Sequence, residues 1–369
     1  MAGEYTAFAT ISEIIRAARS RLPQGLWDHS AGGVGTETTL RRNRQAFETL
    51  AFRPRLLRGV GTPDIHTTFL GHRLESPVML APVGTITQFA RHGSLGPARV
   101  AAKRGTILCY GVMTSPDLTT VGAAAPGHLM LQIYIRGDRS WLAEVVRKAE
   151  DAGYLALCVT ADSIGGGIRD RDLHNRYRAN EGVPHPNLPP DGGHGLEHQL
   201  DFDWDDFAWL RSITKLPTMI KGITSVEDAR MAVELGCAAV YVSNHGGRAL
   251  DHLPSLIEVL PEIVEAVDGK AEVIVDSGFL RGTDVVKAIA LGAKAVLVGK
   301  LQTWGLAAGD EAGLDRALDL LDREIRESMQ LLGVKSLDEL RPSHLRPASP
   351  TRHALDDWNR YEAAPLPRL

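Results

Sequence analysis

Residues 216–245 read LPTMIKGITSVEDARMAVELGCAAVYVSNH, and this stretch decides the fold class. It contains two continuous apolar runs, 216–223 and 238–245, on either side of a segment with helical spacing at 225–236. Continuous apolar runs are typical of strands covered on both faces, as in a parallel sheet. Gly236 follows the last helical turn, where a left-handed C-cap favours glycine. The stretch therefore predicts a strand–helix–strand unit.

The same pattern recurs along the chain. The strand candidates are VMLAPVG (78–84), TILCYG (106–111), LMLQIYI (129–135), LALCVTAD (155–162), LPTMIKGI (216–223), AAVYVSNH (238–245), EVIVDSG (272–278) and AVLVGK (295–300). Alanine- and leucine-rich helical segments alternate with these runs, and two more of them end at Gly153 and Gly292. Eight strand–helix units favour an α/β fold of the (β/α)₈ TIM-barrel type over an open doubly wound sheet.

Three segments do not fit this repeat. Residues 10–22 predict an N-terminal helix with Thr10 as its N-cap. The interval 163–213 is about twice as long as the others and rich in Pro, Gly and His, so it predicts a long loop after the fourth strand, on the active face of a barrel. We expect one domain at 1–340 and an extended C-terminal tail at 341–369 that packs on a neighbour or remains disordered.

Composition narrows the class of protein. The chain has 369 residues, 44% hydrophobic residues and a formal net charge of −4, values that favour neither nucleic acid nor an anionic membrane as a partner. No stretch reaches the roughly 18 apolar residues that span a bilayer, and the N-terminus lacks the pattern of a secretory signal. The three cysteines lie in apolar runs without metal-ligand spacing, which predicts buried thiols in a reducing compartment and no metal site. We therefore expect a cytoplasmic protein.

Polar residues gather where the predicted strands end. They are Tyr134, Thr160, Asp162, Lys221, His245, Asp276, Gly299 and Lys300. In an α/β barrel, the side chains at these ends meet at one face. Burying such groups is costly unless they have partners, so the whole set predicts an active site, although any single member could be structural.

The motif Ser-Asn-His-Gly-Gly-Arg at 243–248 is the most specific of these features. Two glycines after His245 predict a tight turn that allows a ligand to approach the backbone closely. Arg248 offers a bidentate fork for a carboxylate. For an isolated triplet of this kind, the alternative is a turn with a structural histidine.

Two glycine-containing turns follow the seventh and eighth strands, at 276–282 and 298–300. These are the usual phosphate-binding turns of this barrel, and Arg281 and Lys300 would supply positive charge. The turns predict a phosphate but do not distinguish FMN from a phosphosugar.

Together these motifs resemble the FMN-dependent 2-hydroxy acid oxidase and dehydrogenase family, which includes glycolate oxidase, lactate oxidase, mandelate dehydrogenase and hydroxymandelate oxidase. The resemblance runs from about residue 8 to about 335. It rests on SNHGGRALD at 243–251, with APVG at 81–84, LQIY at 131–134, VTAD at 159–162 and IKG at 220–222 in the expected order.

The resemblance implies FMN as cofactor and oxidation of a small 2-hydroxy acid to the 2-oxo acid. His245 would be the base, Asp162 would orient it, and Tyr134 would hydrogen-bond the reacting oxygen. Arg248 and Arg169 would bind the substrate carboxylate. The implied cofactor contacts are Ala81, Pro82, Val83, Gly111, Gln132, Thr160, Lys221, Ser243, Asp276, Gly278, Arg281, Gly299 and Lys300. Molecular oxygen or another acceptor would take the electrons, and a homo-oligomer, a tetramer by resemblance, is expected.

The chain departs from the family pattern around the substrate. His29 stands where a tyrosine usually contacts the carboxylate, and we expect it to titrate near neutral pH if it faces the pocket. Met113 and Gly111 replace a pocket aromatic and a flavin-contacting hydroxyl. The segment 164–169, Ile-Gly-Gly-Gly-Ile-Arg, keeps only the last arginine of the usual motif, and Lys300 replaces an arginine.

Three alternatives remain open from the sequence. The first is an FMN oxidase of a bulky aromatic or amino-acid-derived substrate, favoured by His29, Met113 and the glycine-rich loop. The second is an FMN barrel isomerase of the isopentenyl diphosphate type, which would leave His245 and Arg248 without a carboxylate to serve. The third is a flavoprotein that only binds, against which the intact set of polar residues argues. Gly84 favours slow use of oxygen, but oxidase and dehydrogenase are not separated.

Overall fold

The barrel is closed and entirely parallel. The computed structural model describes residues 8–164, 166–179, 181–189 and 200–350, and its eight barrel strands are hydrogen-bonded in the order β4-β5-β6-β7-β8-β9-β10-β11, with β11 pairing back onto β4. Their bounds are β4 Val78–Leu80, β5 Leu108–Gly111, β6 Leu129–Ile133, β7 Leu157–Thr160, β8 Thr218–Ile223, β9 Ala239–Val242, β10 Glu272–Val275 and β11 Ala295–Val298. The predicted (β/α)₈ barrel is confirmed.

Alternate strand residues form two separate cores. Val78 and Leu80 of β4 belong to the layer between strands and helices, whereas Met79 between them lies in a second cluster inside the barrel. This division follows from the period of two along a strand, and it explains why the runs are apolar throughout. Cys109 and Cys158 lie in the inner cluster, and all three cysteines are buried and free, as expected.

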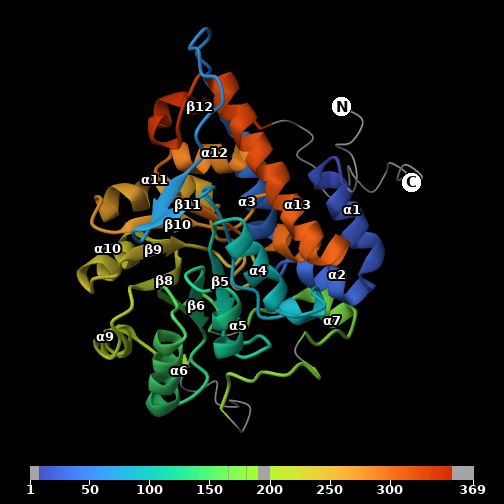
Figure 1. Ribbon diagram of the computed structural model, residues 1–369, viewed down its shortest axis with the longest axis vertical. Helices are drawn as coiled ribbons and strands as arrows, with labels where there is room; N and C mark the ends of the chain where they lie inside the picture. The colour runs from blue at the N-terminus through green and yellow to red at the C-terminus, as the bar shows by residue number, and fades with distance from the viewer. Residues whose placement is uncertain (1–7, 165, 180, 190–199, 351–369) are drawn as a thin grey trace.

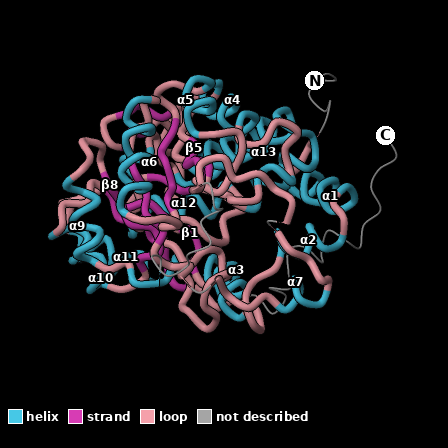
Figure 2. Tube along the Cα trace, turned by 90° about the horizontal axis from the view of Figure 1, so that it is seen from below, coloured by secondary structure: helices cyan, strands magenta, loops and turns pink. Residues whose placement is uncertain are grey.

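Helices surround the strands on the outside, as Figure 2 shows. They are α4 Leu95–Lys103, α5 Leu118–Ala124, α6 Arg139–Asp151, α9 Trp204–Ser212, α10 Val226–Glu234, α11 Leu256–Val267, α12 Gly282–Ala290 and α13 Lys300–Leu332. Local sequence sets their ends: the Ser225 hydroxyl accepts the Asp228 amide at the start of α10. Gly236 after α10 has a φ of 75°, the left-handed value predicted for its C-cap.

The N-terminal helices α1 Ile11–Arg21, α2 Gln24–Ala31 and α3 Thr38–Glu48 precede the barrel. As predicted, Thr10 caps α1 by accepting the Glu13 amide. In Figure 1, α1 and α2 lie beside the long helix α13. A hairpin of β2 Thr67–Phe69 and β3 His72–Leu74 adds Phe69 and Leu74 to the inner cluster.

The interval 163–213 contains regular structure that the sequence analysis did not predict. Helix α9 completes the fourth strand–helix unit, and α7 Asp170–His174 packs on α2. Asn187 ties the interval to the end of β5 by donating to the Tyr110 hydroxyl and the Val112 carbonyl. Residues 190–199 of the predicted loop lie outside the described part.

Part of the predicted tail is docked on the chain itself. Strand β12 Leu345–Pro347 pairs with β1 Leu50–Phe52, and the 3₁₀ turns η2 Leu337–Glu339 and η3 Pro342–His344 precede it. The rest of the predicted extended tail, residues 351–369, lies outside the described residues. Among the helices that are described, none is both long and apolar enough to cross a bilayer.

Candidate active site

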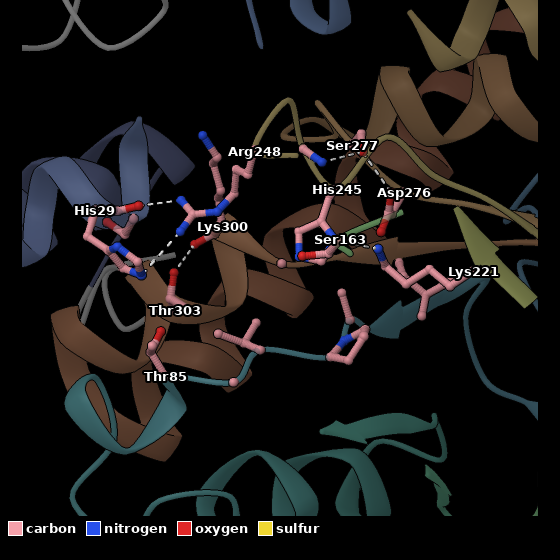
Figure 3. Close-up of a pocket in the computed structure, with 18 of the residues that line it drawn as sticks. His29, Thr85, Ser163, Lys221, His245, Arg248, Asp276, Ser277, Lys300 and Thr303 are labelled. Atoms are coloured by element: carbon pink, nitrogen blue, oxygen red, sulfur yellow. Dashed lines mark hydrogen bonds between the residues drawn. The ribbon is translucent and has the colours of Figure 1, made fainter. Parts of the chain in front are cut away.

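A cavity of about 460 Å³ opens at the carboxyl ends of the barrel strands. This volume is in the range of small-molecule and cofactor sites. Figure 3 shows His245 and Lys221 on one side of the cavity and His29, Arg248 and Lys300 on the other. The sequence-predicted residues that line it are His29, Ala81, Pro82, Val83, Met113, Tyr134, Arg169, Lys221, His245, Arg248, Asp276, Gly278, Gly299 and Lys300.

His245 is held in one orientation by Asp162. Its Nδ1 lies 2.7 Å from Asp162 Oδ1, and its Nε2 lies 3.3 Å from the Tyr134 hydroxyl. A carboxylate at Nδ1 fixes the proton there, so we assign the lone pair to Nε2, which faces Tyr134. This arrangement is that of a general base with its orienting carboxylate.

The backbone of the motif explains its glycines. His245, Gly246 and Gly247 have φ values of 57°, 67° and 73°, so three successive residues are left-handed. At Gly247 a Cβ would lie 2.6 Å from the Leu40 amide nitrogen, so only glycine allows α3 to approach. Asn244 also holds α3, because its amide and that of Asn43 exchange two hydrogen bonds of 2.9 Å.

Lys221 completes the buried cluster. Its ammonium donates to Asp162 Oδ2 at 3.0 Å and lies 3.2 Å from His245 Nδ1. Burial disfavours the charged forms of Lys221, Asp162 and His245. At Lys221 the attraction of Asp162 and Asp276 is stronger than this effect of burial, so the pKa of the ammonium is raised. At Asp162 the Lys221 and His245 contacts likewise outweigh burial and lower the carboxyl pKa. Burial and Lys221 lower the pKa of His245, so its imidazole is neutral at neutral pH and free to accept a proton.

His29 lies in the cavity wall but both of its ring nitrogens have protein partners. Nδ1 is 2.9 Å from Asp172 Oδ2, and Nε2 is 3.1 Å from Arg248 Nη2. Burial lowers the pKa of His29 to about 4, and Arg248 and Arg169 act in the same direction against Asp172. The expected titration near neutral pH is therefore wrong. His29 is a neutral ring that donates to Asp172 and accepts from Arg248.

The arginines expected to bind carboxylate converge here. Arg248 also donates to the carbonyls of His29 and Gly32 at the end of α2. Arg169 lies 3.7 Å from Asp172, whose carboxylate thus connects it with His29. Met113 lines the same cavity, and its carbonyl contacts His185 Nδ1 at 3.0 Å.

Several of the predicted site residues lie behind the residues that line the cavity. Asp162 touches His245, Gln132 donates to Thr160 Oγ1 at 2.8 Å, and a Cβ on Gly111 would lie 3.2 Å from the Gln132 side chain. The Ser243 hydroxyl accepts the His245 amide at 3.1 Å.

Arg281 does not line the cavity. Its guanidinium pairs with Glu324 of α13 at 2.8 Å and is about half exposed. The backbone amides at the start of α12 already have acceptors within the chain. Asp284 accepts the amides of Leu280 and Arg281, and Glu324 accepts the amide of Gly282. The predicted phosphate contact of Arg281 therefore has no geometric support.

The amides at 277–279 and 300–302 are free to bind an anion. Within the described chain, none of these six N–H groups has a hydrogen-bond acceptor. Gly278, Gly299 and Lys300 line the cavity beside them, and 300–302 form the N-terminus of α13, whose first segment runs to a kink at Gly309 and Asp310. Such a cluster of amides suits a phosphate. The Lys300 ammonium itself donates to the Ala31 and Gly32 carbonyls.

Sequence reasoning missed three residues of the site. Arg44 of α3 lines the cavity and donates to the Gly278 carbonyl and to Asp284. Asp172 lies behind His29, and Arg136 lines the cavity two residues after Tyr134. Arg136 could have been predicted from its position just after a strand end. Asp172 could have been predicted from its position three residues after Arg169. Nothing in the sequence marks Arg44.

The charge of the wall fits anionic ligands. The cationic residues in the described lining are Arg44, Arg136, Arg169, Lys221, Arg248 and Lys300, and Asp276 is the carboxylate among them. FMN fits this donor set, because the free amides match its phosphate and buried Lys221 matches a ring that gains negative charge on reduction.

Comparison with known proteins identifies the family. The profile of the FMN-dependent dehydrogenases matches residues 18–347. Glycolate oxidase 3 of Arabidopsis thaliana is 37% identical over 94% of this chain and 98% of its own length. An L-lactate oxidase of a Nostoc species is 38% identical over 90% of this chain and 96% of its own.

The chain belongs to the FMN-dependent 2-hydroxy acid oxidase and dehydrogenase family. Solved structures of this family agree. A mandelate oxidase with (S)-2-phenylpropionate superposes with a TM-score of 0.86 at 38% identity, covering 93% of this chain and 99% of that one. A soluble mutant of the membrane-associated (S)-mandelate dehydrogenase from Pseudomonas putida gives 0.87 at 32% identity, covering 92% and 99%.

Membership makes the chain an FMN-dependent oxidoreductase that acts on the CH–OH group of 2-hydroxy acids. The isomerase alternative and the alternative of a flavoprotein that only binds are thereby set aside.

Proposed function

We propose that this enzyme oxidises a 2-hydroxy acid with His245 as the base and Arg248 and Arg169 as the carboxylate-binding residues. The observation that carries the proposal is the hydrogen-bonded series Asp162–His245–Tyr134 at the wall of a cavity that Arg248 also lines. A substrate carboxylate at Arg248 would bring its 2-hydroxyl group toward His245 and Tyr134.

The chain's own groups account for the proton. His245 Nε2 takes a proton from the substrate during oxidation, and Asp162 then stabilises the imidazolium through Nδ1. Tyr134 orients the reacting oxygen. Burial raises the pKa of its phenol, so Tyr134 stays protonated and donates. Arg248 fixes the other end of the substrate, which keeps the reacting carbon in place.

FMN, when bound, accepts the two electrons that the substrate loses. The segment Ala81, Pro82 and Val83 would lie beside its ring, with Gln132 and Thr160 as ring contacts. Lys221 would stabilise negative charge on the reduced ring. The amides at 277–279 and 300–302 would hold the phosphate.

A substrate larger than glycolate or lactate is the second part of the proposal. Phe89, Met113 and Ile164 give the cavity an apolar side, and Gly166 adds no side chain to it. Structures of mandelate oxidase and mandelate dehydrogenase are among the similar ones. A bulky side chain on the 2-hydroxy acid, aromatic or derived from an amino acid, fits this space.

Anaerobic reduction of the bound flavin tests both parts. The holoenzyme is mixed with glycolate, lactate, mandelate, 4-hydroxymandelate and longer 2-hydroxy acids, and the loss of flavin absorbance is followed. We expect bleaching by the bulky compounds at the highest kred/Kd. FMN-loaded protein that no 2-hydroxy acid bleaches would overturn the proposal. Reoxidation by oxygen or by an artificial acceptor then distinguishes oxidase from dehydrogenase.

The cytoplasmic location, the tetramer and the acceptor expected from the sequence stay predictions.

A further inference from the structure

Arg136 is a cation at the cavity wall whose buried Nε has no hydrogen-bond partner among the described residues. It follows β6, two residues after Tyr134, and lines the cavity half-buried. Its guanidinium carbon lies 5.9 Å from the centre of the Tyr134 ring. Across the described residues, its buried Nε has no hydrogen-bond partner, and no carboxylate contributes to the pKa of its guanidinium.

The Nε of Arg169 is likewise buried without a hydrogen-bond partner among the described residues. What sets Arg136 apart is that its guanidinium contacts neither a carboxylate nor a carbonyl in the part of the chain that the structure describes. Arg44 contacts Asp284 at 2.5 Å, Arg169 lies near Asp172, and Arg248 donates to His29 and to the end of α2. Burial lowers the pKa of Arg136, which means that its charged form loses hydration without compensation from a carboxylate. A half-buried cation is costly when it is not paired. A ligand anion would remove that cost.

The position of Arg136 indicates which part of the substrate would contact it. Under the proposed function, Arg248 holds the carboxylate and His245 with Tyr134 faces the hydroxyl-bearing carbon. The Tyr134 hydroxyl bonds His245, while Arg136 lies near the ring of the same tyrosine. With the carboxylate at Arg248 and the hydroxyl group at His245, the side chain on carbon 2 is the part of the substrate left to contact Arg136.

We propose that Arg136 forms a second anion subsite, and that the substrate is a 2-hydroxy acid whose side chain ends in a carboxylate. The planar guanidinium binds a carboxylate in a bidentate manner. Either an aliphatic spacer or a para-substituted ring can carry this carboxylate, and the test compares one of each. The subsite rests on the proposed function and names its substrate class.

The test compares matched pairs of substrates in anaerobic flavin reduction of the holoenzyme. The pairs are 2-hydroxyadipate with 2-hydroxyhexanoate, and 4-carboxymandelate with 4-methylmandelate. We expect the wild type to favour the dicarboxylate of at least one pair by about tenfold or more in kred/Kd. Arg136→Gln should remove this preference and leave the monocarboxylate within threefold. Arg139→Gln is the matched control, because Arg139 is 61% exposed and pairs with Asp206 on the surface.

Binding provides a readout independent of turnover. The 2-oxo dicarboxylate of the preferred pair perturbs the flavin spectrum on binding, and its Kd should rise about tenfold in Arg136→Gln. Equal losses for both members of each pair, or a wild-type preference for the monocarboxylates, would overturn the subsite. If Arg136 increases kred/Kd more for 3-phosphoglycerate than for either dicarboxylate, the carboxylate assignment is overturned. If no 2-hydroxy acid at all bleaches the flavin, the proposed function itself fails, and the subsite fails with it.

Discussion

The cavity has an inner half at the ends of the barrel strands and an outer half formed by added helices and turns, and the side chains of the two halves are held in different ways. At the inner half, Asp162 accepts from both His245 Nδ1 at 2.7 Å and the Lys221 ammonium at 3.0 Å, and the three residues come from neighbouring barrel strands. At the outer half, His29, Asp172 and Arg248 come from α2, α7 and a turn, and the buried Nε of Arg136 has no described hydrogen-bond partner. The difference teaches that the reactive group is preorganised by the barrel, whereas recognition of the substrate depends on segments added around it.

His245→Gln should have the largest effect and tests the inner half directly. Removing a general base costs about 10²–10⁴-fold in rate. We expect flavin reduction to fall by about a thousandfold while the flavin stays bound, as measured by stopped-flow and by bound-FMN absorbance. His252→Gln is the control, since His252 follows the same strand but is 69% exposed. A rate within tenfold of wild type would remove His245 as the base.

Two aspartates sharpen the comparison between the halves. Asp162→Asn leaves Lys221 buried without its closest counter-ion, so we expect a loss of about 3 kcal/mol in the free energy of unfolding and a fall in reduction rate of about a hundredfold. Asp172→Asn should leave the reduction rate within about threefold and raise the substrate Kd about fivefold, because Asp172 contacts His29 and Arg169 and stabilises the charge of Arg248 without contacting His245. Urea unfolding and single-turnover kinetics measure both. Equal effects of the two variants would abolish the distinction.

His29→Gln should alter the pH dependence of stability. In the unfolded chain His29 binds a proton near pH 6.5, but in the folded protein only near pH 4, so between these values the unfolded state binds more protons. The contribution of neutral His29 is complete above pH 6.5 and is lost as the pH falls to 4, by about 3 kcal/mol. Urea unfolding at both pH values should show a shallower loss in His29→Gln than in wild type. Parallel pH profiles would mean that the folded protein accommodates a charged His29.

Arg281→Ala should have the smallest effect. Its ion pair with Glu324 is about half exposed, and such pairs contribute about 1 kcal/mol or less. We expect the Kd for FMN, measured by flavin fluorescence, to stay within about twofold. A rise of tenfold or more would restore the sequence-based assignment of Arg281 to the phosphate.

The barrel and the inner half could be predicted because their signals are local. A continuous apolar run marks each strand. The residue that follows the run lies at the active face, regardless of the conformation of the surrounding loops. Tyr134, Lys221 and His245 were found in this way, and all line the cavity. The capping residues Thr10 and Gly236 were likewise predictable, since a cap depends on its own helix.

The outer half could not be predicted with the same success because its contacts join distant segments. Asp172 is 143 residues from His29, and Arg44 is 240 residues from Asp284. The helix α9 was missed because the Pro- and Gly-rich stretch before it dominates the pattern of the whole interval.

The sequence by itself therefore determined the barrel and the family and predicted His245 and Asp162 as neighbours at the active face, since periodicity and strand-end motifs depend on neighbours along the chain. Only the tertiary structure decided that His29 is neutral, that Arg281 pairs with Glu324 outside the cavity lining, and that Arg136 lines the cavity with its Nε lacking a described hydrogen-bond partner. Burial and charge pairing set these properties, and both depend on which distant segments meet.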